Sequence, residues 1–187
     1  MLMQEVKDTI DYWTKWANSN NHSNYDIAIL KIWIKFENYL GEVFLNYAIG
    51  HSSEYGYSPK LKIQFCDEYH FYIFMREGNK KYIEYLNKIE TLSEHIFEKN
   101  PFDIILKDYD RKNKFEQLKC LRNYIAHESE EAKSKLIKSC FRGKKEDFIT
   151  PDHFLKSHPK KNREKSYYSI YVDLILEVLE GVNSNIE

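Results

Sequence analysis

Apolar residues along this chain recur mostly at intervals of three and four positions, the spacing of one face of an α-helix. The longest such run extends from residue 26, where Asp26 is the expected N-cap, to residue 49, before Gly50. Two apolar seams flank its polar stripe, so we expect this helix to be central and to pack on two sides. The seams are Ile29, Trp33, Phe36, Leu40, Val43 and Tyr47, and Leu30, Ile34, Leu45 and Ala48.

The same spacing predicts further helices that are separated by turn residues. We expect them at residues 6–17, 67–76, 80–97, 112–127, 130–141 and 166–182. Residues 101–107 can form one more turn, and Thr150-Pro151-Asp152 is a helix start signal. A brief extended stretch, residues 61–65, does not predict a sheet. The expected fold is therefore all-α: a compact helical bundle over residues 1–187, with a long central helix and additional short helices.

Composition and charge limit the classes of function. The chain has 187 residues, which favours one domain, and 28 basic against 29 acidic residues give a formal charge of -1. Any affinity for RNA must therefore come from a local patch. The first residues lack the apolar region of a signal peptide, and no stretch is long enough to cross a membrane. Cys66, Cys120 and Cys140 form no C-x-x-C pair, the pattern of reduced thiols in a cytoplasmic protein.

Three residues on the expected 112–127 helix point to chemistry. Arg122 is a permanent cation, His127 can carry a proton, and Asn123 lies four residues before His127, on the same face. A cation beside a proton carrier suits phosphodiester cleavage, in which negative charge develops and a hydroxyl loses its proton. On a helical wheel His127 lies roughly 160° from the core stripe. His127 and Asn123 would then face solvent in a monomer, which favours a second subunit covering that face.

The Arg-polar-x3-His spacing resembles the HEPN superfamily of helical nucleotide-binding proteins and ribonucleases. The resemblance extends over residues 26–141, and residues 166–182 would complete the bundle. It implies a homodimer with a composite groove, in which Arg122 stabilises the transition state and His127 is the general acid/base toward the RNA 2′-hydroxyl. Asn123 would orient His127 or the phosphate. The implied cleavage needs no metal or cofactor and leaves a 2′,3′-cyclic phosphate.

The resemblance also implies a biological setting and shows one departure. Endoribonucleases of this kind act as toxins or phage-defence effectors, so an antitoxin or a defence-system protein is an expected partner beside RNA. Some family members that are controlled by nucleotidyltransferase antitoxins carry a tyrosine two residues after the histidine. That position is Ser129 here, which puts control by tyrosine AMPylation in doubt.

Glu37 is a candidate supporting residue. It falls on the second apolar seam of the central helix, where a buried carboxylate requires a cation. Arg122 is one candidate partner, through a bidentate pair; a lysine or solvent is the other possibility. His127 also has a simpler interpretation, as a surface residue that interacts with the helix dipole.

Residues 142–165 are interpreted as a basic polar linker. Its cations could follow RNA phosphates, or the segment could be a solvated connection. The candidate RNA-binding residues are Lys144, Lys145, Lys160, Lys161 and Arg163.

Two functions therefore stay open. The first is a metal-independent endoribonuclease, and the second is a non-catalytic dimeric module that binds RNA or a partner protein. Possible metal sets such as Asp103/Asp108/Asp110 or Cys66/His70 lack a convincing number of ligands, so no metal site is predicted. The chain also lacks a glycine-rich phosphate loop, G-x-S-x-G and H-E-x-x-H.

Overall fold

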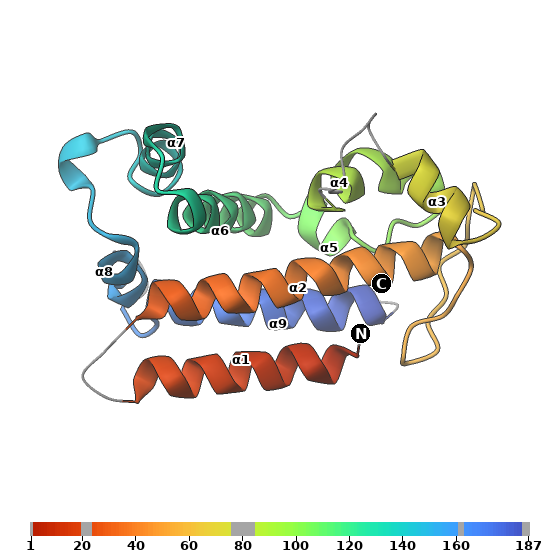
Figure 1. Cartoon of the computed structure of the whole chain (residues 1–187), viewed down its shortest axis with the longest axis horizontal. Coiled ribbons are helices and arrows are strands. Elements are labelled where there is room, and N and C mark those ends of the chain that lie inside the picture. Colours follow the sequence, from red (N-terminus) through yellow and green to blue (C-terminus); the bar gives the residue numbers. More distant parts are fainter. Residues whose placement is uncertain (1, 20–23, 76–84, 161–162, 185–187) are drawn as a thin grey trace.

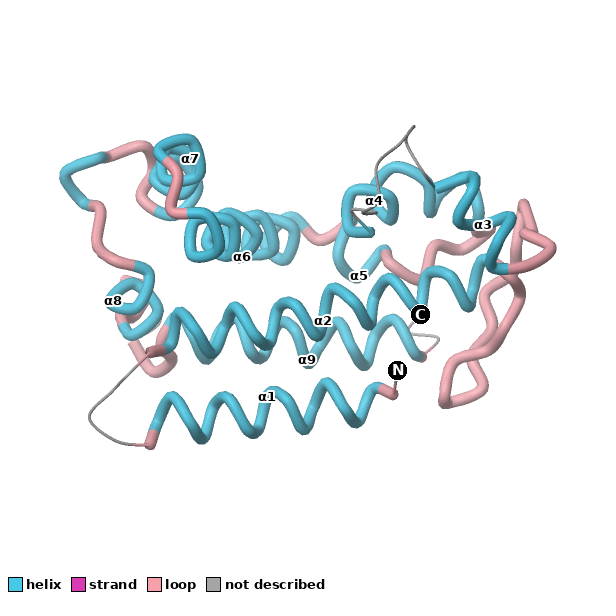
Figure 2. The backbone as a smooth tube through the Cα atoms, viewed as in Figure 1, coloured by secondary structure: helices cyan, strands magenta, loops and turns pink. Residues whose placement is uncertain are grey.

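The long helix α2 (Tyr25–Ala48) runs through the middle of the molecule (Figure 1). The computed structural model describes residues 2–19, 24–75, 85–160 and 163–184. In this part of the chain the structure is helical and contains no strand, which confirms the all-α prediction. Figure 2 shows long loops at the two ends of α2 and a shorter loop beside its middle.

Three of the longer helices pack against α2. α1 (Met3–Asn18) and α9 (Tyr167–Asn183) lie beside it, and α6 (Tyr109–His127) lies across its opposite side (Figure 1). The first apolar seam predicted for α2 is buried against these neighbours over its whole length. The second seam is buried only in part, because the side chain of Ile34 is 42% exposed. The central position of α2 is thus confirmed, whereas its burial on two sides holds mainly for its C-terminal half.

The C-terminal end of α2 is packed by short helices and aromatic rings. Phe44 contacts the rings of Phe71, Phe97 and Phe102 at centroid distances of 5.6, 6.1 and 5.6 Å. These rings come from α3 (Glu68–Met75), the residue after α4 (Tyr85–Ile96), and the residue before α5 (Asp103–Leu106). The extended stretch at residues 61–65 contributes an isolated bridge between Leu61 and Phe97. Arg76 and residues 80–84, also predicted as helix, lie outside the described residues.

The N-terminal end of α2 meets the chain that follows α6. α7 (Glu130–Cys140) packs against α6, and a single 3₁₀ turn, η1 (Lys145–Asp147), leads to α8 (Pro151–Lys156). α8 rests on α2 and α9 through the buried side chains of Phe154 and Leu155. Residues 142–165 are therefore more than a linker, because they contain a helix that is anchored in the core.

Several helices are capped by the residue just before them, among them α8 at the predicted start signal Thr150, but α2 is not capped by Asp26 as predicted. Ser129, Thr150 and Ser166 each accept a hydrogen bond from a backbone amide of the helix that they precede. α2 begins at Tyr25, so the predicted cap Asp26 lies inside its first turn. The amide of Tyr25 instead donates to Oδ1 of Asp152 in α8, at 3.0 Å. The N-terminus of α2 is thus capped by a tertiary contact that local sequence does not indicate.

Candidate functional site

Helix α6 presents the Arg122–His127 stretch at its C-terminal end, above the N-terminal half of α2 (Figure 1). The sequence predicts Phe115, Leu118, Leu121 and Ile125 as core positions of this helix; the first three are buried and hold α6 against the core, whereas Ile125 is only half-buried. The helix starts at Tyr109, three residues earlier than predicted, because Asp108 accepts a hydrogen bond from the amide of Arg111 at 2.7 Å. The apolar stripe therefore fixes the rotation of α6 and keeps Arg122 at the edge of the core.

Arg122 is held by two partners. Its Nη2 donates to Oε2 of Glu37 at 3.1 Å, and its Nη1 donates to Oδ1 of Asn123 at 2.7 Å. The two side chains of the ion pair are 24% and 12% exposed. The predicted pairing of Glu37 with Arg122 is confirmed. The predicted bidentate geometry is wrong, because the second terminal nitrogen of the guanidinium is directed to Asn123.

Glu37 explains why a cation belongs at this position. The residue is only 9% exposed and lies on α2 among apolar neighbours. Moving a carboxylate out of water costs several kcal/mol unless a cation and hydrogen bonds replace the lost solvation. Arg122 supplies both in one planar group. The pair therefore links α2 to α6 and sets the direction of the guanidinium.

The side chains of His127 and Asn123 differ in their exposure to solvent. His127 is the last residue of α6 and its side chain is exposed, as the helical wheel predicts. Its imidazole forms no hydrogen bond with any side chain that the structure describes. Asn123 is half-buried, which corrects the prediction that it faces solvent with His127. Asn123 thus orients Arg122 in this structure and has no contact that orients His127.

The backbone turns sharply immediately after His127. Glu128 adopts a left-handed conformation with φ of 47° and ψ of 26°, and its amide donates to the carbonyl of Tyr124 at 2.8 Å. This is the usual geometry of a helix C-terminus, although glycine is the residue that adopts it without strain. The chain therefore bends just after His127, which leaves the imidazole at a corner of the molecule.

An exposed apolar face continues from the Glu37–Arg122 pair along α2. Ile27 and Ile34 are 39% and 42% exposed, and they are seven residues apart, on one face of the helix. Ile34 also lies one turn before Glu37, so the isoleucines and the ion pair belong to one side of α2. These two exposed side chains make this face a candidate contact surface, although two residues fall short of the large contiguous apolar patch that marks an interface.

The predicted RNA-binding residues lie on two separate parts of the surface. Lys144 and Lys145 are exposed at η1, whereas Lys160 and Arg163 are exposed between α8 and α9. Lys161 lies outside the described residues. The η1 segment is connected to the candidate site by a ring contact that the sequence did not indicate.

That contact joins Phe148 to Tyr124 of α6, with ring centroids 5.9 Å apart. Phe148 also packs against Phe141 at 5.6 Å, and Nζ of Lys133 lies 5.2 Å from its ring centroid. Because Tyr124 is three residues before His127, the loop lies about one helical turn from the imidazole. Sequence analysis missed the cations of α7, although the absence of any acidic residue from 132 to 145 was a visible signal.

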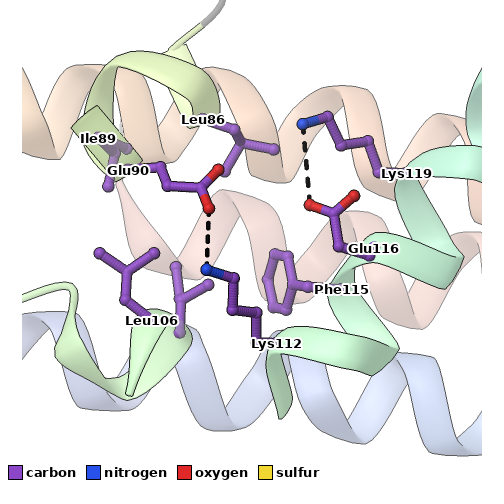
Figure 3. A pocket seen from close by; sticks show the side chains of 9 residues that line it. Leu86, Ile89, Glu90, Leu106, Lys112, Phe115, Glu116 and Lys119 are labelled. Carbon is purple, nitrogen blue, oxygen red and sulfur yellow. Dashed lines mark ion pairs between the residues drawn. The ribbon is translucent and has the colours of Figure 1, made fainter. Parts of the chain in front are cut away.

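A small hollow between α4, α5 and α6 lies away from this site (Figure 3). Phe115 and Leu86 are among the residues that line it, and Lys112 and Glu90, which also line it, form an ion pair 3.0 Å long. The cavity volume is about 30 Å³, which is enough for one or two water molecules. The hollow is therefore too small for a substrate, and Arg122 and His127 do not line it.

The cysteines offer no reactive centre inside the fold. Burial raises the pKa of the Cys140 thiol to about 12 and also raises the pKa of Cys120. A thiol with a raised pKa forms little of the nucleophilic thiolate at neutral pH. Cys66 is exposed, and the three cysteines are free. Among the described residues, no group of three or more His, Cys, Asp or Glu side chains could hold a metal ion.

Comparison of the chain with models of known protein families, with curated proteins and with solved structures found no match. Within the part of the chain that the structure describes, no helix has the length and apolar character needed to cross a membrane.

Proposed function

We propose that this chain is a metal-independent endoribonuclease of the HEPN type, with Arg122 and His127 as its catalytic residues. The observation that supports this most strongly is the state of Arg122. Its guanidinium is fixed by Glu37 and Asn123 yet is still 24% exposed, so its other N–H groups can reach an anion. A cation that is held in place before the reaction stabilises developing charge without reorganising.

In the proposed reaction the RNA strand supplies its own nucleophile. His127 accepts the proton of a 2′-hydroxyl, and the 2′-oxygen attacks the adjacent phosphorus. The bond from phosphorus to the 5′-oxygen breaks, and that oxygen takes up a proton from the protonated His127 of the partner subunit. Arg122 donates hydrogen bonds to the non-bridging oxygens, on which negative charge develops. The products are a 2′,3′-cyclic phosphate and a 5′-hydroxyl, and no metal takes part.

The proposed active form is a homodimer with a composite site. The reaction needs a base at the 2′-hydroxyl and an acid at the 5′-oxygen. One exposed histidine cannot serve as both in the same turnover unless a proton moves between these two oxygens. A two-fold contact over the Ile27 and Ile34 face would bring a second His127 into the groove. Light scattering should then give twice the chain mass of 22.6 kDa at micromolar concentration. A mass of one chain that persists with bound RNA contradicts the composite site.

The decisive experiment is incubation of pure protein with a defined RNA, with and without EDTA. We expect cleavage that EDTA does not stop, and fragments whose 3′ ends resist phosphatase until mild acid opens the cyclic phosphate. His127→Ala should lower the rate by about 10²–10⁴-fold. His95→Ala is the matched control, because His95 is also an exposed histidine in the last turn of a helix. Equal rates for the two folded variants would remove His127 from the mechanism.

The alternative function is a non-catalytic dimeric module that binds RNA or a partner protein. One observation favours it: Arg122 already has protein partners for both terminal nitrogens, which is also the arrangement of a structural ion pair. Under this alternative His127→Ala leaves RNA binding and any cellular phenotype unchanged, and no RNA is cleaved. Under the ribonuclease proposal, expression in bacteria is toxic as a toxin or phage-defence effector would be, and an antitoxin or defence partner restrains it.

A further inference from the structure

Beyond the first turn of α7, which carries the exposed Glu130 and Glu131, the surface that leads away from His127 is basic and is held in a fixed position. Between residues 132 and 145 the sequence has six cations and no acid: Lys133, Lys135, Lys138, Arg142, Lys144 and Lys145. All except Lys133 are exposed, and Lys133 lies over the ring of Phe148. Glu146 and Asp147 follow directly and offset only part of this charge.

Most of these cations lack an internal counter-charge. Lys135 pairs with Glu131 at 2.7 Å, the usual contact four residues apart on a helix. The ion pairs that the structure gives for its described residues do not include Lys138, Arg142, Lys144 or Lys145. Exposed cations without counter-charges create a local positive potential, although the whole chain carries a formal charge of -1.

The loop that carries the last of these cations is ordered by its own contacts. The amide of Gly143 donates to the carbonyl of Ile137 at 3.0 Å, and the amide of Lys144 donates to the carbonyl of Phe141 at 2.9 Å. Phe148 then fixes the end of the loop against Tyr124 of α6. The cations of residues 142–145 are therefore held at a fixed distance from the helix that carries Arg122 and His127.

We propose that α7 and the 141–148 loop form a binding surface for the phosphate backbone of single-stranded RNA, contiguous with the Arg122–His127 site. This inference rests on the proposed function for its choice of RNA as the polyanion. A single strand is favoured because the proposed reaction needs a 2′-hydroxyl that can align behind the scissile phosphorus. A duplex holds its backbone in A-form geometry and prevents that alignment.

Binding can be measured apart from cleavage. The His127→Ala protein is titrated into a fluorescein-labelled single-stranded 12-nucleotide RNA, and anisotropy is followed at several salt concentrations. Lys144→Glu/Lys145→Glu in this background should weaken binding at least 10-fold. It should also flatten the salt dependence, because each lost phosphate contact removes about 0.7 from the slope for a single strand. Lys60→Glu/Lys99→Glu is the matched control, since it changes the net charge equally on exposed lysines near the other end of α2.

Each outcome decides for or against the proposal. The proposal is supported if only the loop variant weakens RNA binding and if the protein binds a 12-base-pair RNA duplex less tightly than the single strand. The proposal is overturned if the control pair weakens RNA binding equally or if the duplex binds more tightly than the single strand. It is also overturned if the protein binds phosphatidylserine vesicles but no RNA. If the wild type cleaves RNA while the loop variant binds normally, this surface is wrong and the ribonuclease proposal stands. If RNA binds through the loop but is never cleaved, the surface stands and the catalytic proposal fails.

Discussion

Replacing Arg122 with lysine tests whether this residue acts through its charge or through its geometry. The guanidinium contacts two acceptors at once, Glu37 at 3.1 Å and Asn123 at 2.7 Å. A lysine ammonium is a single donor centre on a flexible chain, so it cannot hold both contacts and still present an aligned donor to a phosphate. We therefore expect Arg122→Lys to be nearly as inactive as Arg122→Ala.

The expected loss in rate follows from the loss of one aligned donor. Removing such a donor from the transition state costs about 2.7–4 kcal/mol, which corresponds to a rate reduction of about 10²–10³. The effect on folding should be smaller than for a fully buried pair, whose disruption costs about 3–5 kcal/mol. The side chains of Arg122 and Glu37 are 24% and 12% exposed, so solvent screens part of the interaction. We expect Arg122→Ala to lower the free energy of unfolding by about 1–3 kcal/mol, and Arg122→Lys by less.

The assay is single-turnover cleavage of an RNA that contains one scissile site, with circular dichroism to confirm that each variant is folded. Arg111→Lys provides a matched control, because Arg111 lies on the same helix and also pairs with a carboxylate, Glu177, at 3.4 Å. That control should cleave at the wild-type rate. Activity of Arg122→Lys within a few-fold of wild type would refute the geometric role and reduce Arg122 to a general source of positive charge.

Three further substitutions or reactions test the structure around the site. Glu37→Gln should lower the free energy of unfolding by about 1–2 kcal/mol in a urea titration, because Arg122 loses its counter-charge; an unchanged midpoint would show that solvent already screens the pair. Glu128→Gly should raise the free energy of unfolding by about 0.5–1 kcal/mol, since glycine adopts the φ of 47° without strain. As a control, Glu130→Gly, inside the first turn of α7, should lower the free energy of unfolding by a similar amount. If both glycine variants change the free energy of unfolding in the same direction, Glu128 is not strained. At pH 8 iodoacetamide should alkylate Cys140, whose pKa is raised to about 12, on the order of 10³ times more slowly than a thiol of ordinary pKa. Mass spectrometry of digested protein measures this, and rapid labelling of Cys140 in the folded chain would contradict its burial.

Helix positions were predictable because the apolar period and the local start signals agree along most of the chain. Ser129, Thr150 and Ser166 cap their helices through contacts three residues away, and such contacts are encoded locally. The start of α2 was placed wrongly because its cap, Asp152, is 127 residues distant in sequence. Nothing near Asp26 indicates that contact, which depends on how α8 docks on α2.

The candidate site was predictable to a similar degree. A carboxylate on an apolar seam predicts a cation, and the spacing along α6 makes Arg122 available to Glu37. The division of the guanidinium between Glu37 and Asn123 depends on the separation and rotation of α2 and α6, which the sequence pattern does not specify. The polar composition of residues 142–165 predicts a linker. Buried Phe154 and Leu155, two residues in that polar context, are sufficient to anchor it.

The two proposed catalytic residues differ in how firmly the fold holds them. Arg122 is fixed by partners on α2 and α6, so its position is set before any ligand arrives. His127 is exposed on the last residue of α6 and has no hydrogen bond to a described side chain. Ordering a free side chain costs about 0.5–1.5 kcal/mol, and in the monomer nothing in the described structure offsets that cost. If the chain is a ribonuclease, the group that orients His127 must come from the RNA or from a second copy of the chain. Catalytic efficiency should then rise with assembly, whereas the Glu37–Arg122 pair should be equally stable in the monomer and the dimer.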